Sequence, residues 1–279
     1  MSMRIVRQPA VAGRFYPGRA PELDATVTTL LDEARAVAAP PAAPPEALIV
    51  PHAGYVYSGP TAARGYVLLE SARGAIERVV LLGPAHYVAF TGVALPEADA
   101  FATPLGEVRL DPRAEELAES LPQLISYAEA HAPEHSLEVQ LPFVQRVLGD
   151  VEVLPLLVGD AGPEQVAEVI EACWGGPETL VLVSSDLSHY LPYDTARERD
   201  GATVGHILDG DWPLPDRSAC GARGINGLLV VAPRRGLRPE LVDYRNSGDT
   251  AGDRARVVGY ASVSFTHPPG LGTAESEVT

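Results

Sequence analysis

Hydrophobic residues along this chain gather in short runs, and amphipathic segments lie between them. Residues 47–50, 79–82 and 179–183 are almost wholly apolar, and Gly, Pro or Ser bounds each of them. Short bounded runs of this kind are typical of buried strands in a parallel or mixed sheet. Residues 151–159 form another strand-like run with a proline inside it. Further strand-like runs are TGVAL, EVRL, ELVDYRNSG and RVVGYASVSF.

Helical spacing of apolar residues marks the intervening segments. Helices are expected at 21–39, about 60–71, from Asp111-Pro112 onward, 135–148 with a kink or split at Pro142, 163–174, 194–208 and 224–236. Alternating strands and helices predict an α/β fold. We expect a single three-layer α/β/α sandwich around a mixed, mostly parallel sheet over residues 1–267. Residues 268–279 hold few apolar groups and are expected to form a flexible tail.

Composition narrows the classes of protein. The 279 residues carry a net charge of -16, and all 21 basic residues are arginine. This acidic surface disfavours nucleic acid and anionic membranes as partners. The two cysteines suggest no disulfide framework, and no apolar stretch approaches the roughly 20 residues needed to cross a bilayer. Because the N-terminus also lacks the apolar core of a signal peptide, we expect a cytoplasmic protein.

Polar side chains with metal-binding chemistry follow the apolar runs. They are His52, His86, Asp186 with His189, and Cys220. Ligands of open α/β sheets bind at the carboxyl ends of the strands, where imidazole, thiolate and carboxylate groups together suit a transition metal. The alternative for His52 is a hydrogen bond to a loop carbonyl. Cys220 precedes a predicted helix, whose dipole lowers a thiol pKa, but a lone cysteine is more often a buried structural thiol.

Other polar residues allow several roles. Asp186 and His189 share a face if their turn is helical. The pair could then supply a metal ligand, act as an acid/base couple, or use the carboxylate to orient the imidazole. Asp186 also suits the N-cap of a helix. His135 lies at the start of a predicted helix. It could cap that helix or help to hold an anion at the helix N-terminus. The remaining histidines and the second cysteine are expected to be structural or on the surface: His131, His206, His267 and Cys173.

Several familiar catalytic motifs are absent from the sequence. It has no G-x-S-x-G turn, no C-x-x-C and no H-E-x-x-H, and without lysine it has no phosphate-binding P-loop. No G-x-G-x-x-G follows a strand. The metal-site hypothesis therefore survives partly because its competitors lack their required residues.

The chain resembles the Memo family, the B component of the AmmeMemoRadiSam group, in segments that keep their order along nearly its whole length. The segments are VAGRFYP, PHAGYVYSGP, LLGPAHY, FATPLGEV, EHSLEVQLPF, PLLVG, SSDLSHY and CGARGI. The resemblance implies the fold of class III extradiol dioxygenases, with His52, His86 and Cys220 as ligands of iron or copper and with Asp186 and His189 in the pocket. It also implies phosphopeptide binding, as in animal members. Ala85, Tyr87 and Ala222 depart from the family pattern around the ligands, which bears on the substrate.

The leading hypothesis is a metal-binding protein with a redox, dioxygenase-like pocket. Here Asp186 would be an outer ligand or base, and His189 and His135 acid/base or substrate-anchoring groups. Tyr57 and Tyr87 would line the pocket for a small-molecule or peptide ligand. A thiolate in place of the carboxylate of oxygenases is softer and also suits copper(I) or zinc. The alternatives are a phosphopeptide- or anion-binding module without turnover and a zinc-dependent hydrolase. Association with other AmmeMemoRadiSam components is a further expectation.

Overall fold

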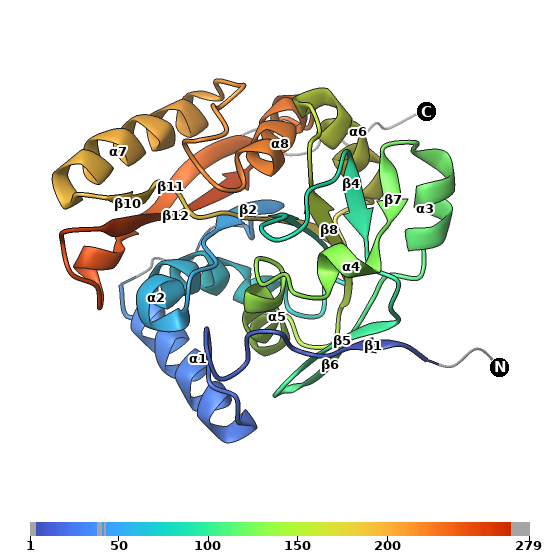
Figure 1. Cartoon of the computed structure of the whole chain (residues 1–279), viewed down its shortest axis with the longest axis horizontal. Helices are drawn as coiled ribbons and strands as arrows, with labels where there is room; N and C mark the ends of the chain where they lie inside the picture. Colours follow the sequence, from blue (N-terminus) through green and yellow to red (C-terminus); the bar gives the residue numbers. More distant parts are fainter. Residues whose placement is uncertain (1–3, 38–40, 42, 269–279) are drawn as a thin grey trace, which may run out of the picture.

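A nine-stranded mixed sheet forms the centre of the computed structural model, which describes residues 4–37, 41 and 43–268 (Figure 1). In spatial order its strands are β10 (His189–Leu191), β12 (Val257–Thr266), β2 (Ala47–Val50), β9 (Thr179–Ser184), β3 (Arg78–Pro84), β8 (Glu152–Val158), β4 (Val93–Leu95) and β7 (Leu124–Ser126), while β11 (Arg238–Asn246) pairs with β12. The expected tail lies, from residue 269 onward, outside the described residues.

The four central strands run parallel. β2 pairs with β9, β9 with β3, and β3 with β8, whereas β12 joins β2 in the antiparallel sense. Val50 lies opposite Ser184 at the carboxyl ends of β2 and β9. The predicted mixed sheet is therefore confirmed, and its parallel centre brings the carboxyl ends of β2, β9 and β3 together.

Helices cover both faces of this sheet, so the predicted α/β sandwich is confirmed. Val80 and Leu82 pack into one core cluster, and Val79 and Leu81 into the other, because successive strand residues point to opposite faces. The first cluster includes α6 (Pro163–Cys173), α7 (Tyr193–Asp209) and α8 (Ala222–Arg234). The second includes α1 (Ala20–Arg35), α2 (Tyr55–Tyr66) and α5 (Leu141–Val147).

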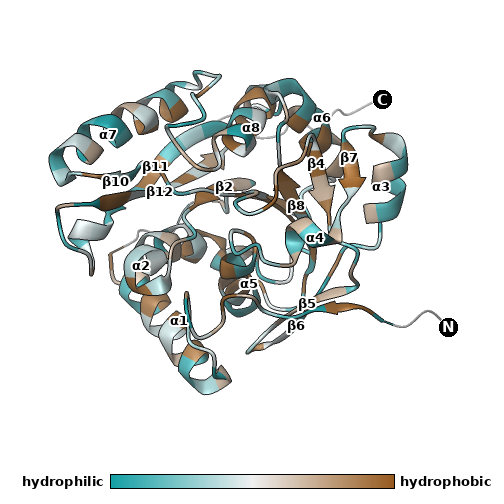
Figure 2. Cartoon of the chain, viewed as in Figure 1, coloured by the Kyte–Doolittle hydropathy of each residue, from teal (hydrophilic) through white to brown (hydrophobic). Residues whose placement is uncertain are grey.

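Smaller elements flank the central sheet. A separate three-stranded sheet of β1 (Val6–Arg7), β5 (Ala100–Thr103) and β6 (Gly106–Arg109) lies near the described N-terminal end (Figure 1). Figure 2 shows the central strands as hydrophobic and much of α7 as hydrophilic. No helix within the described residues combines the length and apolar character that a membrane crossing requires.

Some predicted helices begin or end elsewhere. The helix expected at 60–71 begins at Tyr55 as α2 and continues beyond Tyr66 as a 3₁₀ helix, Val67–Ala72. The helix expected at 135–148 is reduced to a 3₁₀ turn, Glu138–Gln140, followed by α5, with Pro142 in the first turn, where its missing N–H costs nothing. The helix expected from Asp111 begins at Ala114 as α3 (Ala114–Ser120), and Asp111 accepts a hydrogen bond from the Arg113 N–H in the turn before it.

Candidate metal centre

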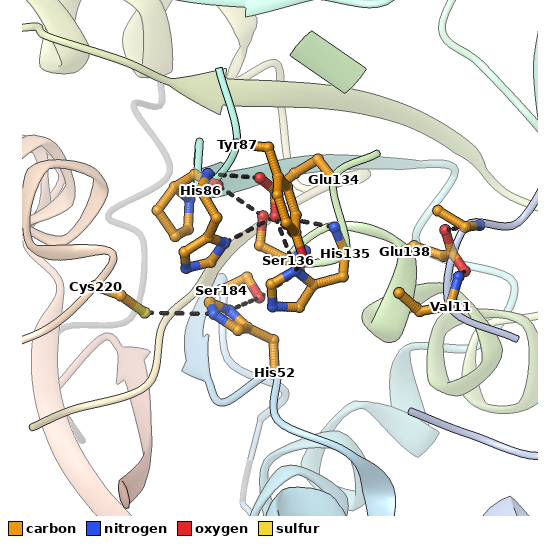
Figure 3. Close-up of polar contacts among 12 residues, drawn as sticks. Val11, His52, His86, Tyr87, Glu134, His135, Ser136, Glu138, Ser184 and Cys220 are labelled. Atoms are coloured by element: carbon orange, nitrogen blue, oxygen red, sulfur yellow. Dashed lines mark hydrogen bonds and ion pairs between the residues drawn. The ribbon is translucent and has the colours of Figure 1, made fainter. Parts of the chain in front are cut away.

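The parallel strands place three polar side chains at one edge of the sheet. His52, His86 and Asp186 each lie two residues beyond the end of a strand, β2, β3 and β9 respectively. Cys220 approaches from the loop before α8. One ligand atom from each of His52, His86 and Cys220 lies within 4.8 Å of the other two. Figure 3 shows Cys220 directed at the ring of His52, with Sγ 3.3 Å from Nε2.

Ser184 determines which ring nitrogen of His52 carries the hydrogen. The Ser184 hydroxyl donates its single hydrogen to the Ser136 carbonyl oxygen, 2.7 Å away, so it accepts from His52 Nδ1 at 2.9 Å. The Nε2 lone pair of His52 therefore faces Cys220. Burial lowers the pKa of His52 to about 3, so the ring is neutral at pH 7 and Nε2 is able to bind a cation.

Glu134 has the same effect on His86. Its carboxylate, which accepts only, lies 2.9 Å from His86 Nδ1, so this nitrogen donates and the Nε2 lone pair stays free. The carboxylate also accepts from the backbone N–H groups of His86, His135 and Ser136, at 2.6, 2.9 and 2.9 Å. Burial alone raises the pKa of Glu134, but these hydrogen bonds, led by that of the His86 side chain, lower it to about 2.

Sequence reasoning missed Glu134. The available signal was an acidic residue directly before His135 in a polar turn. His86, Glu134 and His135 also offer ligand atoms within 4.8 Å of one another. However, the Glu134 carboxylate already accepts the hydrogen bonds described above, so its role is to orient His86 rather than to form a second cation site.

Cys220 holds a neutral thiol in this setting. Its Sγ accepts from the Asp186 N–H at 3.2 Å, and burial, followed by the Asp186 charge, raises the pKa of the thiol. The predicted lowering is wrong although Cys220 directly precedes Gly221, the N-cap of α8, because burial raises the pKa more than the hydrogen bonds from the Asp186 and Gly221 N–H groups lower it. Desolvation therefore outweighs the dipole, and deprotonation of Cys220 requires a nearby positive charge.

The turn from Asp186 to His189 is not helical, so the condition under which the two residues would share a helix face is not met, and His189 begins β10. Asp186 is buried, and its Oδ1 accepts from the His52 N–H at 2.8 Å. Burial raises the pKa of this carboxyl group. His189 Nδ1 donates to the Leu187 carbonyl oxygen at 2.9 Å, so its Nε2 lone pair is free to accept a proton.

His135 is placed differently from the prediction. It precedes a 3₁₀ turn rather than opening a helix, so it offers no helix N-terminus for an anion. Its ring stacks on His86 with 4.6 Å between the ring centres, and Phe15 packs against it at 4.7 Å. Burial, with the neighbouring His52, lowers the pKa of His135 to about 4. The Tyr87 hydroxyl lies 3.3 Å from His135 Nδ1.

A cavity of about 580 Å³ adjoins this cluster. Asp186 and His135 belong to its lining and also contact the candidate ligands, and His189 and Tyr57 line it as well. Tyr87 is exposed and is not part of this lining. A molecule in the cavity would thus meet ionisable groups beside the three ligand atoms.

The remaining histidines and Cys173 lie outside the ligand set. His131 is buried and donates from Nε2 to the Ala94 carbonyl oxygen, and Cys173 is buried in the core. His206 and His267 are exposed beside acidic side chains.

Comparisons with known proteins agree over nearly the whole chain. The model of the Memo-like protein family matches residues 7–264. MEMO1 family proteins from Archaeoglobus fulgidus and Sulfolobus acidocaldarius are 39% and 34% identical to this chain. The matches cover 93% and 94% of this chain and 99% of each relative. One from Aquifex aeolicus is 35% identical over 93% of this chain and 99% of its own length. The solved structure of an uncharacterized Escherichia coli K12 protein, with 15% identity, covers 78% of this chain and 98% of that chain at a TM-score of 0.49.

Proposed function

The chain belongs to the Memo-like protein family, and we propose that it binds iron or copper through His52, His86 and Cys220 beside a redox, dioxygenase-like pocket. The observation that carries the proposal is the orientation of the ligand atoms. Hydrogen bonds from the chain itself keep the Nε2 lone pairs of both histidines free, and that of His52 faces the cysteine sulfur.

The donor set fits a soft or borderline transition metal. Two imidazoles and one thiol are softer than the two histidines and one carboxylate of non-haem iron oxygenases, so copper(I) and iron suit the set, and zinc is an alternative. A bound cation favours loss of the Cys220 proton, whose pKa burial has raised. When bound, iron or copper would supply one-electron redox chemistry.

Side chains around the cavity would handle protons. His189, whose Nδ1 donates to a backbone carbonyl oxygen, would act as the base through Nε2, while Asp186, whose carboxyl pKa is raised by burial, retains its proton to higher pH than an exposed aspartate. His135 is neutral at pH 7 and packs on His86, so it positions that ring and anchors substrate. Tyr57 forms part of the cavity wall.

Metal content tests the ligand assignment. We expect protein purified without oxygen to hold close to one iron or copper per chain by inductively coupled plasma mass spectrometry. His52→Ala, His86→Ala and Cys220→Ala should lose most of it. His206→Ala and Cys173→Ala are the matched controls, because they remove the same groups away from the site. Wild-type metal levels in His52→Ala and Cys220→Ala would contradict the assignment.

Oxygen dependence separates the redox hypothesis from the zinc-hydrolase alternative. We expect turnover of a bound substrate to require oxygen and iron or copper, and His189→Ala to reduce it. Activity that persists with zinc in the absence of oxygen would instead favour hydrolysis, with Asp186 as the base.

A further inference from the structure

The cavity wall includes a cation that the proposed metal site does not use. Arg256 is the single arginine among the residues lining this cavity. Within the described residues, no carboxylate forms an ion pair with its guanidinium, so none of their side chains competes with an anion for the N–H groups of Arg256.

An irregular strand holds this guanidinium in place. β10 and β12 pair His189 with Val258 and Leu191 with Val257, so Tyr190 is the extra, bulged residue. Its φ of 59° lies in the left-handed region, which bulky residues rarely adopt. Bulges of this kind redirect a side chain, and here the Tyr190 ring lies under Arg256, with 5.0 Å from the guanidinium carbon to the ring centre.

The rest of the lining indicates which anion fits. The aromatic rings of Phe15 and Tyr57 offer apolar contacts in this lining, and Tyr260 lies buried behind it. Two carboxyl groups, Asp186 and Asp253, also line the cavity and oppose a doubly charged ligand. Oδ1 of Asp253 accepts from the Ala255 N–H at 2.7 Å, so this side chain is engaged with its own loop.

We propose that Arg256, stacked on Tyr190, anchors the carboxylate of a small aromatic monocarboxylate whose body lies along the tyrosines toward Asp186 and His135. The guanidinium fork matches a carboxylate in a bidentate geometry, and stacking on the ring leaves its N–H edges free. The idea that this ligand is a substrate rests on the proposed metal function. Its binding through Arg256 does not depend on that function.

Calorimetric titration of the full chain with benzoate tests the anchor. We expect benzoate to bind at millimolar concentrations, and Arg256→Gln to weaken it about tenfold, the loss of one charge-assisted contact. Arg254→Gln is the matched control, because this arginine belongs to the same loop but stacks on Tyr193, outside the cavity. Asp253→Asn should tighten binding by removing a like charge.

Two further probes define the chemistry of the ligand. Benzamide, which has the same shape without the charge, should bind more weakly than benzoate. Phenyl phosphate should also bind more weakly, because its second charge has no partner. Equal benzoate affinity in wild type and Arg256→Gln, no benzoate binding to wild type, or tighter binding of phenyl phosphate or benzamide would each overturn the proposal.

Metal analysis of the same samples keeps the two proposals distinct. Metal-free wild-type protein that binds benzoate through Arg256 supports the anchor, even if no metal is ever retained and the proposed function fails. A normal metal content together with benzoate binding independent of Arg256 overturns the anchor and leaves the metal site intact.

Discussion

Glu134→Gln is the substitution that most directly probes how the chain prepares its ligand atoms. The wild-type carboxylate accepts hydrogen bonds from the His86 ring and from three backbone N–H groups. An amide of the same shape loses the charge, and its NH₂ group faces donors. The His86 ring hydrogen on Nδ1 is then held at best by a neutral amide oxygen, which fixes it less firmly than the carboxylate does.

The size of the effect follows from the pKa of Glu134. The pKa is lowered from 4.5 to about 2 in a residue that is 2% exposed, and at about 1.36 kcal/mol per pKa unit this corresponds to about 3 kcal/mol. Because the folded-state pKa is the lower one, this stability is present above pH 4.5 and is lost as the pH falls toward 2. We expect the free energy of unfolding of Glu134→Gln at pH 7 to fall by about 3 kcal/mol. Metal affinity should fall about 10- to 100-fold, as for other carboxylates that orient histidine ligands.

Urea unfolding and competitive metal titration measure the two effects, and Glu138→Gln is the matched control. Glu138 is equally buried and accepts from the N–H groups of Ala10 and Val11 and from the Tyr16 hydroxyl, but it touches none of the ligand residues (Figure 3). Its substitution should lower stability and leave metal affinity unchanged. Wild-type metal affinity in Glu134→Gln, or an equal loss in Glu138→Gln, would refute this reasoning.

The other predictions concern the cysteine loop, the pH dependence of stability and the metal preference. Gly221→Ala should lower the free energy of unfolding in urea by about 1–3 kcal/mol and reduce bound metal, because the new Cβ would lie 2.8 Å from the Ser184 carbonyl oxygen. Gly205→Ala is the control and should not destabilise the protein, because the space at its Cβ is open. His131→Gln should flatten the fall in stability between pH 6.5 and about 4, because burial lowers the pKa of His131 from 6.5 to about 4 and the unfolded chain alone takes up the proton in that range; an unchanged slope would contradict this. Cys220→Asp should retain iron(II) and lose copper(I) in metal analysis, since a carboxylate is a harder ligand, and retention of copper(I) would count against Cys220 as a ligand.

The sequence predicts the strand ends well because their signal is local. Buried strands of a parallel sheet read as apolar runs, and the polar residue two to four positions beyond each run is visible without any structure. His52 and His86 were identified in this way, and the sheet topology then brings them together because β2, β9 and β3 are parallel neighbours.

Other parts of the site depend on contacts that are distant in sequence. Glu134 lies 48 residues from His86, and Ser184 lies 132 residues from His52, so neither hydrogen bond can be inferred from local spacing. The thiol pKa of Cys220 was predicted with the wrong sign because burial depends on the whole fold. The turn from Asp186 to His189 is extended because β12 pairs with His189, which local helical spacing does not reveal.

The hydrogen bond between Ser184 and His52 has a consequence for the order of assembly. Ser184 ends β9 opposite Val50, at the centre of the sheet, and its hydroxyl donates to the Ser136 carbonyl oxygen, so the proton arrangement on His52 is established once those strands have paired and Ser136 is in place. The groups that orient His86 and Cys220 likewise come from the chain. Folding therefore completes the receptor before any cation arrives, and loading becomes entry into a finished pocket. A metal bound at the proposed site would then be exchangeable without unfolding the protein, and the identity of the ion would reflect what the cell supplies.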